Sequence, residues 1–161
     1  MKIFRINLFL KFKDFLISLV KVLISSTNEK KINKILKKNS KKKHATLISQ
    51  CRVGLILILN FLKKKDPHKN EIIFSSYNLP AMINIVKQLK FKIIFSPIKI
   101  NDGSFDLEKL KKRINKKTLA LVQTNMFNSP KNSILLKKLC KKNKIVLIED
   151  NAIYFDNYFM Q

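Results

Sequence analysis

Apolar runs of strand length alternate with helical patterns along the last two thirds of this 161-residue chain. The strand-like runs are Glu71 to Ser76, Lys92 to Ser96, Leu119 to Thr124 and Ile145 to Asp150. The helical patterns cover residues 52–65, 78–90, 106–115 and 131–143. Uninterrupted apolar strands are typical of a sheet covered on both faces, and strict alternation of strand and helix favours parallel pairing. The pattern therefore predicts an α/β domain with a mostly parallel sheet and flanking helices.

The beginning of the chain shows a different pattern. Residues 3–25 are mainly apolar, with polar positions every three or four residues, which predicts an amphipathic helix with a narrow polar stripe. Such a helix buries most of its surface against the rest of a domain, a second subunit or a lipid surface. The first two are favoured, because the stripe carries mixed charge where lipid-binding helices carry dense lysine.

The segment 28–44 is rich in lysine, with five lysines between Lys37 and Lys43. This composition predicts a solvated helix end and loop. We therefore place a domain boundary after residue 44. An N-terminal helical, lysine-rich segment (1–44) then precedes the α/β domain (45–161).

The sequence contains no clear targeting segment and no clear metal-binding motif. Lys11, Lys13, Asp14 and Lys21 interrupt the apolar N-terminal stretch, so a membrane-spanning helix is not expected, and no small-residue cleavage site follows it. Cys51 and Cys140 are the only cysteines and lie far apart, so neither a metal site nor a disulfide scaffold is indicated. A reducing cytoplasm is the expected location.

The formal net charge of +24 would usually suggest nucleic acid or an acidic membrane surface as partner. However, only three of the 34 basic residues are arginine: Arg5, Arg52 and Arg113. Specific recognition of phosphates and bases favours the bidentate arginine fork, and no aromatic side chains lie among the clustered lysines for base stacking. AT-rich coding explains the lysine excess better, so nucleic acid is not an expected partner.

Polar residues cluster at the carboxyl ends of the predicted strands. They are Ser75, Ser76, Tyr77, Asn78, Asn125, Asn128, Glu149, Asp150 and Asn151. Parallel strands end at the same edge of a sheet, which is where open α/β sheets bind ligands. The start of the helix at Arg52 adds free N–H groups and a positive dipole end, which suit a phosphate. An anion site facing Asp150 is an arrangement typical of a cofactor site.

Four segments together resemble the DegT/DnrJ/EryC1/StrS family of sugar aminotransferases. They are SQCRVGL (Ser49 to Leu55), NEIIFSSYNLP (Asn70 to Pro80), INKKTLALVQTNMFNSP (Ile114 to Pro130) and KNKIVLIEDNA (Lys142 to Ala152). The order and spacing of these blocks carry the resemblance, which extends from about Ala45 to Tyr158. It implies a type I aminotransferase fold, of which the chain would form the incomplete front part of the large domain.

The resemblance also implies a cofactor, pyridoxal 5'-phosphate (PLP), and residues that bind it. Cys51 and Arg52 match the helix-start loop that cradles the cofactor phosphate, and Asp150 matches the aspartate that pairs with the pyridine nitrogen. Leu79 stands where the family usually has a stacking aromatic ring, and Asn125 replaces a common histidine. Further departures occur at Asn128, in place of a turn glycine, and at Ile153, in place of a glutamine or histidine.

The resemblance further implies the transfer of an amino group from an amino acid such as glutamate to a keto-sugar nucleotide, carried out by a homodimer. The family's Schiff-base lysine lies well beyond the IED strand, and only eleven residues follow Asp150. We therefore expect a truncated or split chain that is not catalytic alone. Two alternatives remain open: a non-catalytic scaffold that keeps this fold, and a basic protein that binds anionic partners, such as nucleic acid or a lipid surface, through residues 30–43.

Overall fold

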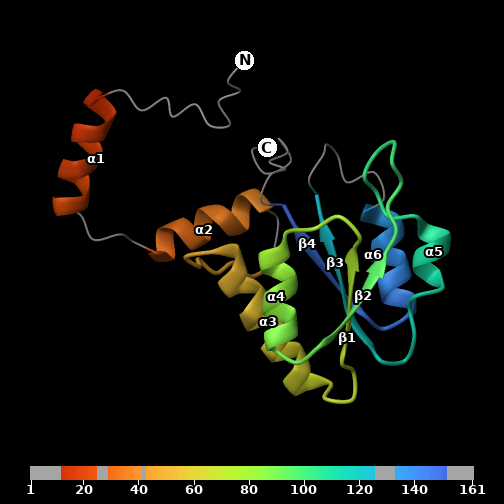
Figure 1. Ribbon diagram of the computed structural model, residues 1–161. Helices are drawn as coiled ribbons and strands as arrows, with labels where there is room; N and C mark the ends of the chain where they lie inside the picture. The colour runs from red at the N-terminus through yellow and green to blue at the C-terminus, as the bar shows by residue number, and fades with distance from the viewer. Residues whose placement is uncertain (1–11, 25–28, 41–42, 126–132, 152–161) are drawn as a thin grey trace. The chain divides into compact units, whose positions relative to one another are not determined.

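A computed structural model of the chain describes residues 12–24, 29–40, 43–125 and 133–151 (Figure 1). The chain divides into two compact units, Met1–Leu47 and Ile48–Gln161. Each unit is described by itself below. Within the described residues, no helix is both long enough and apolar enough to cross a membrane.

The first unit contains two helices, α1 (Phe12–Ile24) and α2 (Glu29–Ser40). The helix predicted over residues 3–25 is confirmed over α1, and the rest of that range lies outside the described residues. None of the residues of α1 is buried, so what covers its apolar surface stays a prediction. Where the sequence predicted a helix end and loop, α2 continues as a helix to Ser40. Its apolar residues Ile32, Ile35 and Leu36 follow helical spacing, which explains why the helix extends through so many lysines.

The second unit alternates helices and strands as the sequence predicted. The elements are α3 (Cys51–Lys65), β1 (Glu71–Ser75), α4 (Pro80–Gln88), β2 (Lys92–Ser96), α5 (Leu107–Lys111), β3 (Thr118–Thr124), α6 (Ser133–Lys142) and β4 (Val146–Asp150). Strand limits agree with the prediction to within about a residue, whereas α4 and α5 are shorter than their patterns and α6 ends one residue earlier than its pattern.

The described strands form one four-stranded sheet in the order β2-β1-β3-β4. Every neighbouring pair is parallel, with Phe74 opposite Phe95 and Thr124 opposite Asp150. The predicted fold class, a parallel α/β domain with flanking helices, is therefore confirmed. Because all four strands point the same way, their carboxyl ends lie along one edge of the sheet.

Helices cover both faces of the sheet (Figure 1). Ile72 and Phe74 pack with α3 and α4 on one face, while Ile73 packs with α5 and α6 on the other. The two central strands β1 and β3 are almost wholly buried, as predicted from their apolar runs. The outer strands β2 and β4 are only partly covered, and Phe95 of β2 is 47% exposed.

Candidate functional site

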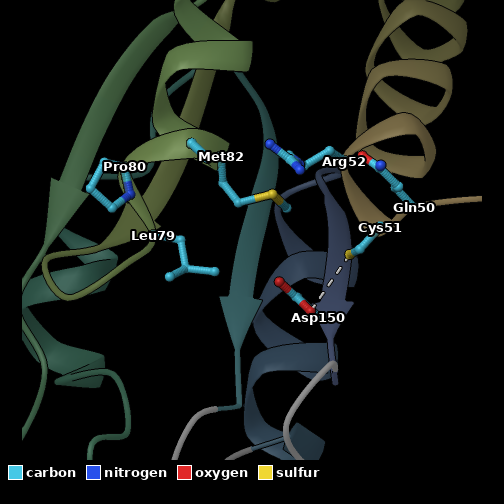
Figure 2. Close-up of a pocket in the computed structure, with 8 residues that line it drawn as sticks. Gln50, Cys51, Arg52, Leu79, Pro80, Met82 and Asp150 are labelled. Atoms are coloured by element: carbon cyan, nitrogen blue, oxygen red, sulfur yellow. Dashed lines mark hydrogen bonds between the residues drawn. The ribbon is translucent and has the colours of Figure 1, made fainter.

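A cavity of about 490 Å³ lies at the carboxyl edge of the sheet (Figure 2). Its walls come from three elements that are distant in sequence: the start of α3, the start of α4 and the last residue of β4. The lining residues are Gln50, Cys51, Arg52, Leu79, Pro80, Ala81, Met82 and Asp150. The fold thus brings together four of the five residues that the sequence predicted for cofactor binding.

Asp150 forms the acidic wall of this pocket and is only 7% exposed. It ends β4, and its backbone carbonyl accepts a hydrogen bond from the N–H of Asn125 at 2.9 Å, which fixes the strand end beside β3. Since side chains alternate along a strand, Asp150 lies on the same face as Ile148, which packs toward α3 and α4. This alternation of side chains directs the carboxylate of Asp150 into the pocket.

Cys51 is the first residue of α3, and its thiol donates a hydrogen bond to Oδ1 of Asp150 at 3.8 Å (Figure 2). Burial, the negative charge of Asp150 and this hydrogen bond together raise the pKa of the Cys51 thiol above its ordinary value. A helix N-terminus usually favours the thiolate. Here burial, with the charge and hydrogen bond of Asp150 adding to it, outweighs that effect, so the pKa of the thiol is raised and the thiol remains protonated at neutral pH.

The start of α3 provides the donors expected of an anion site. Gln50 is the N-cap residue and makes no side-chain capping bond, and the first turn contains no acidic residue. The helix's first backbone bonds run from Val53 and Gly54 to the carbonyl of Gln50. The N–H groups of Cys51 and Arg52 precede these bonds and are directed out of the helix end, where an anion is stabilised.

The opposite wall is apolar and belongs to the start of α4. Leu79 is the N-cap residue, 49% exposed, and Pro80 occupies the first helical turn, where its fixed φ and missing N–H are tolerated. Asn78 holds this loop in place, because its side chain accepts from the N–H of Leu79 at 2.8 Å and donates to Oγ1 of Thr124 at 2.9 Å. The arrangement presents Leu79 to the pocket as a side wall.

Asn125 does not line the pocket. Its side chain donates to Oδ1 of Asn151 and accepts a hydrogen bond from Nε2 of Gln123 at 2.9 Å. These contacts link the ends of β3 and β4. Asn128 and Ile153, where the sequence departs from the family pattern, lie outside the described residues.

Sequence reasoning identified Leu79 but missed four other lining residues: Gln50 before α3, and Pro80, Ala81 and Met82 at the start of α4. The sequence does contain a signal for this helix start at the ligand edge. A proline two residues after Asn78 marks a helix start, and that start directly follows a strand ending at the ligand edge. Two helix N-termini at one sheet edge should have been expected to line one site.

Fold and site together define a parallel α/β domain with a pocket at the carboxyl edge of its sheet, where the start of α3 and the buried carboxylate of Asp150 form part of the wall. The model of the DegT/DnrJ/EryC1/StrS aminotransferase family matches residues 18–155. The chain belongs to this family. The family and the chain's structural neighbours are PLP-dependent enzymes.

Two curated relatives and one solved structure show what the chain is similar to. The chain is 27% identical over 110 residues to UDP-4-amino-4,6-dideoxy-N-acetyl-beta-L-altrosamine transaminase of Helicobacter pylori (68% of this chain, 29% of the relative). It is 30% identical over 112 residues to GDP-perosamine synthase of Vibrio cholerae (70% of this chain, 30% of the relative). Helicobacter pylori PseC, an aminotransferase involved in the biosynthesis of pseudoaminic acid, superposes with a TM-score of 0.71 at 25% identity, over 84% of this chain and 38% of that one.

The chain thus spans about three tenths of the length of the curated relatives it matches. The residues of the pocket nevertheless fit PLP. An uncapped helix start suits its phosphate, a buried carboxylate suits a protonated ring nitrogen, and apolar side chains suit the ring faces. The cavity volume falls in the usual range of small-molecule sites.

Proposed function

We propose that this chain forms the cofactor-binding part of a PLP-dependent enzyme that transfers an amino group from an amino acid such as glutamate to a keto-sugar nucleotide. Family membership and the activities of the named relatives support the reaction class. The observation that carries the proposal is the Asp150 carboxylate, buried in the pocket wall that also contains the start of α3.

Asp150 acts by holding a proton at the pyridine nitrogen. A buried carboxylate that pairs with the ring N–H favours the protonated ring, because the ion pair lies away from bulk water. PLP supplies an electron sink when bound, and the protonated ring is the stronger sink. The register that places Asp150 at the end of β4, beside β3, holds the carboxylate in one position.

The start of α3 binds the phosphate. The N–H groups of Cys51 and Arg52 donate to phosphate oxygens, and the helix dipole adds to the attraction. The guanidinium of Arg52, on the same turn, provides a permanent positive charge. These contacts fix the phosphate end of the cofactor while Asp150 fixes the ring end.

Leu79, Pro80 and Met82 form the apolar side of the pocket and exclude water from one face of the ring. Exclusion of water strengthens the pairing of Asp150 with the ring nitrogen. Amino transfer also needs a lysine amine as covalent anchor and proton carrier. None of the residues lining the described pocket is a lysine, so we propose cofactor binding for these 161 residues and amino transfer for the whole protein.

We further propose that the protein functions as a homodimer in the cytoplasm. The outward face of α3 supports dimerisation, since Leu57 and Phe61 are 56% and 65% exposed one helical turn apart. Cysteines that form no disulfide support a reducing compartment.

Binding of pyridoxamine 5'-phosphate by the full 161-residue chain tests the proposal. This probe carries the ring and phosphate of the cofactor but no aldehyde, so the many surface lysines cannot react with it. We expect saturable one-to-one binding by calorimetry. Asp150→Asn should weaken binding by about tenfold to a hundredfold, because a charge-assisted hydrogen bond is lost.

Asp66→Asn is the matched control, since Asp66 lies at the far end of α3 and is not part of the pocket. It should bind like the wild type. The proposal is wrong if the wild-type chain shows no saturable binding, or if Asp150→Asn binds as tightly as Asp66→Asn.

A further inference from the structure

The contact between Cys51 and Asp150 has no role in the cofactor chemistry described above. It joins the first residue of α3 to the last residue of β4, which are 99 positions apart. The thiol and the carboxylate both line the pocket, so the contact lies within the site (Figure 2). A thiol is a weak hydrogen-bond donor, yet here it faces an ionisable carboxylate that is largely removed from water.

The chain's two thiols differ sharply in accessibility. Cys51 is exposed at the pocket wall, whereas Cys140 of α6 is 3% exposed and packs in the core between α6 and the sheet. Burial, together with the charge of Glu149, raises the pKa of Cys140 to about 11. A reagent that attacks thiols therefore meets one accessible sulfur, and that sulfur lies in the cofactor pocket.

A group attached to Cys51 changes the pocket in two ways. It removes the proton that the thiol donates to Oδ1 of Asp150, and it adds atoms to a sulfur that lies 3.8 Å from that oxygen. The start of α3, where we place the phosphate, and the carboxylate, where we place the ring nitrogen, both adjoin this sulfur. Even a small adduct therefore occupies space that both ends of the cofactor need.

We propose that Cys51 is a positioning residue for Asp150 and the site at which thiol-reactive electrophiles close the cofactor pocket. The free thiol holds the carboxylate through Oδ1, and the modified sulfur blocks the cofactor. This inference rests on the proposed binding of the cofactor beside Asp150.

Asp150 also controls how readily Cys51 reacts. Burial contributes most to the raised pKa of the thiol, and the charge and hydrogen bond of Asp150 raise it further, which disfavours the reactive thiolate. Loss of the Asp150 charge leaves the thiol at an uncapped helix N-terminus, where the thiolate is stabilised. Neutralising Asp150 should therefore speed modification of Cys51, with or without cofactor.

The first experiment follows alkylation of the full chain by iodoacetamide without cofactor. The Cys51 thiolate displaces iodide to form an S–CH₂ bond, and the thiol proton passes to the buffer. Peptide mass spectrometry reports each cysteine separately. At neutral pH we expect Cys51 to react about threefold faster or more in Asp150→Asn than in the wild type and in Asp66→Asn. Cys140 should react slowly in all three. Equal rates at Cys51 would overturn the coupling of the two residues.

The second experiment measures binding of pyridoxamine 5'-phosphate before and after alkylation. The alkylated wild type and the alkylated Cys140→Ala variant should lose about tenfold or more in affinity, whereas treated Cys51→Ser should lose nothing. Among untreated chains, Cys51→Ser keeps a hydrogen-bond donor to Asp150, so it should bind about threefold more tightly than Cys51→Ala.

Two outcomes would overturn the inference: unchanged affinity after alkylation of Cys51, or equal affinities for Cys51→Ala and Cys51→Ser. If the untreated wild type binds no pyridoxamine 5'-phosphate, the proposed function fails, and with it the blocking of the cofactor. The alkylation rates then still decide whether Asp150 controls the thiol.

Discussion

Leu79 gives the pocket an apolar wall where an aromatic ring would stack on a planar cofactor. We predict that Leu79→Tyr tightens binding of pyridoxamine 5'-phosphate, because an offset-stacked ring adds about 0.5–1.5 kcal/mol beyond apolar contact, or roughly twofold to tenfold in affinity. Calorimetric titration measures the change. Leu135→Tyr is the matched control, since Leu135 is 50% exposed on α6, outside the pocket. Equal affinities for the two variants would contradict the placement of Leu79 beside the ring.

Glu71, at the start of β1, has a buried carboxylate that accepts hydrogen bonds from two side chains. It is 3% exposed and accepts from Nζ of Lys92 at 3.0 Å and Nδ2 of Asn115 at 2.7 Å. Burial alone would raise its pKa, but the hydrogen bonds from Asn115 and Lys92 and the charges of Lys92 and Lys117 lower the pKa below its ordinary value of 4.5. The ionised form therefore stabilises the folded state above pH 4.5, and this contribution is lost as the pH falls below that value.

We predict that Glu71→Gln lowers the free energy of unfolding at pH 7 by about 1 kcal/mol or more, because charged hydrogen bonds are lost. The difference from the wild type should shrink as the pH falls from about 5 to 3. Urea denaturation at several pH values measures it. Glu108→Gln is the control, because the side chain of Glu108 is 78% exposed and its pair with Lys111 is a surface pair. A difference for Glu71→Gln that does not depend on pH would rule out this explanation.

The sequence identified which residues end the strands, but it did not reveal on which face of the sheet each side chain lies. Thr124 and Asp150 are register partners and lie on the α3–α4 face. Asn125 comes one residue later, so strand parity directs it to the opposite face, where it meets Gln123. A resemblance that aligns both residues cannot show this difference. The face of the sheet on which a strand-end side chain lies can be determined only once the register of the strands is known.

At the scale of elements, strands were easier to predict than helix ends. An apolar run ends where the buried sheet ends, as it does at Ser75 and Asp150. Helix ends depend on local backbone bonds that composition does not show. The pattern over 106–115 predicted ten residues, but α5 ends at Lys111, and the N–H of Arg113 bonds to the carbonyl of Leu110 in a tight turn. The start of α5 was easier to predict than its end, because the side chain of Asp106 caps the helix by accepting a hydrogen bond from the N–H of Lys109.

Gly54 lies in the first turns of α3, and a Cβ atom there would approach Cδ1 of Ile48 too closely. Alanine is a better helix former than glycine by about 1 kcal/mol. We predict that Gly54→Ala raises the free energy of unfolding by about that amount when Ile48 is also alanine, and by less when Ile48 is present. Urea denaturation of the single and double variants measures the coupling. An equal gain in both backgrounds would show that the tip of Ile48 moves aside at no cost.

At the scale of the whole molecule, both core clusters lie within residues 55–148. The family match extends further, over residues 18–155, and so includes α2 and part of α1. The sequence could predict the α/β unit because its buried strands are continuous and apolar. The sequence could not predict which surface covers α1, because an apolar helix has the same pattern whether a domain, a subunit or a lipid surface covers it.

Dimerisation can be tested on the outward face of α3. We predict that Phe61→Lys weakens dimerisation by about tenfold or more, because a large apolar side chain at an interface is replaced by a charge that must be desolvated. Analytical ultracentrifugation measures the dissociation constant. The net charge of +24 also opposes association, so the comparison belongs at both low and high salt. Charge repulsion between copies is screened at high salt, whereas the lost apolar contact is not.

The matched control is Ile134→Lys on α6, where Ile134 is 70% exposed. This variant introduces the same charge on the opposite face of the sheet and should leave the dissociation constant nearly unchanged. A wild-type chain that stays monomeric at high salt, or a Phe61→Lys variant that dimerises as tightly as Ile134→Lys, would exclude this face of α3 as the dimer interface.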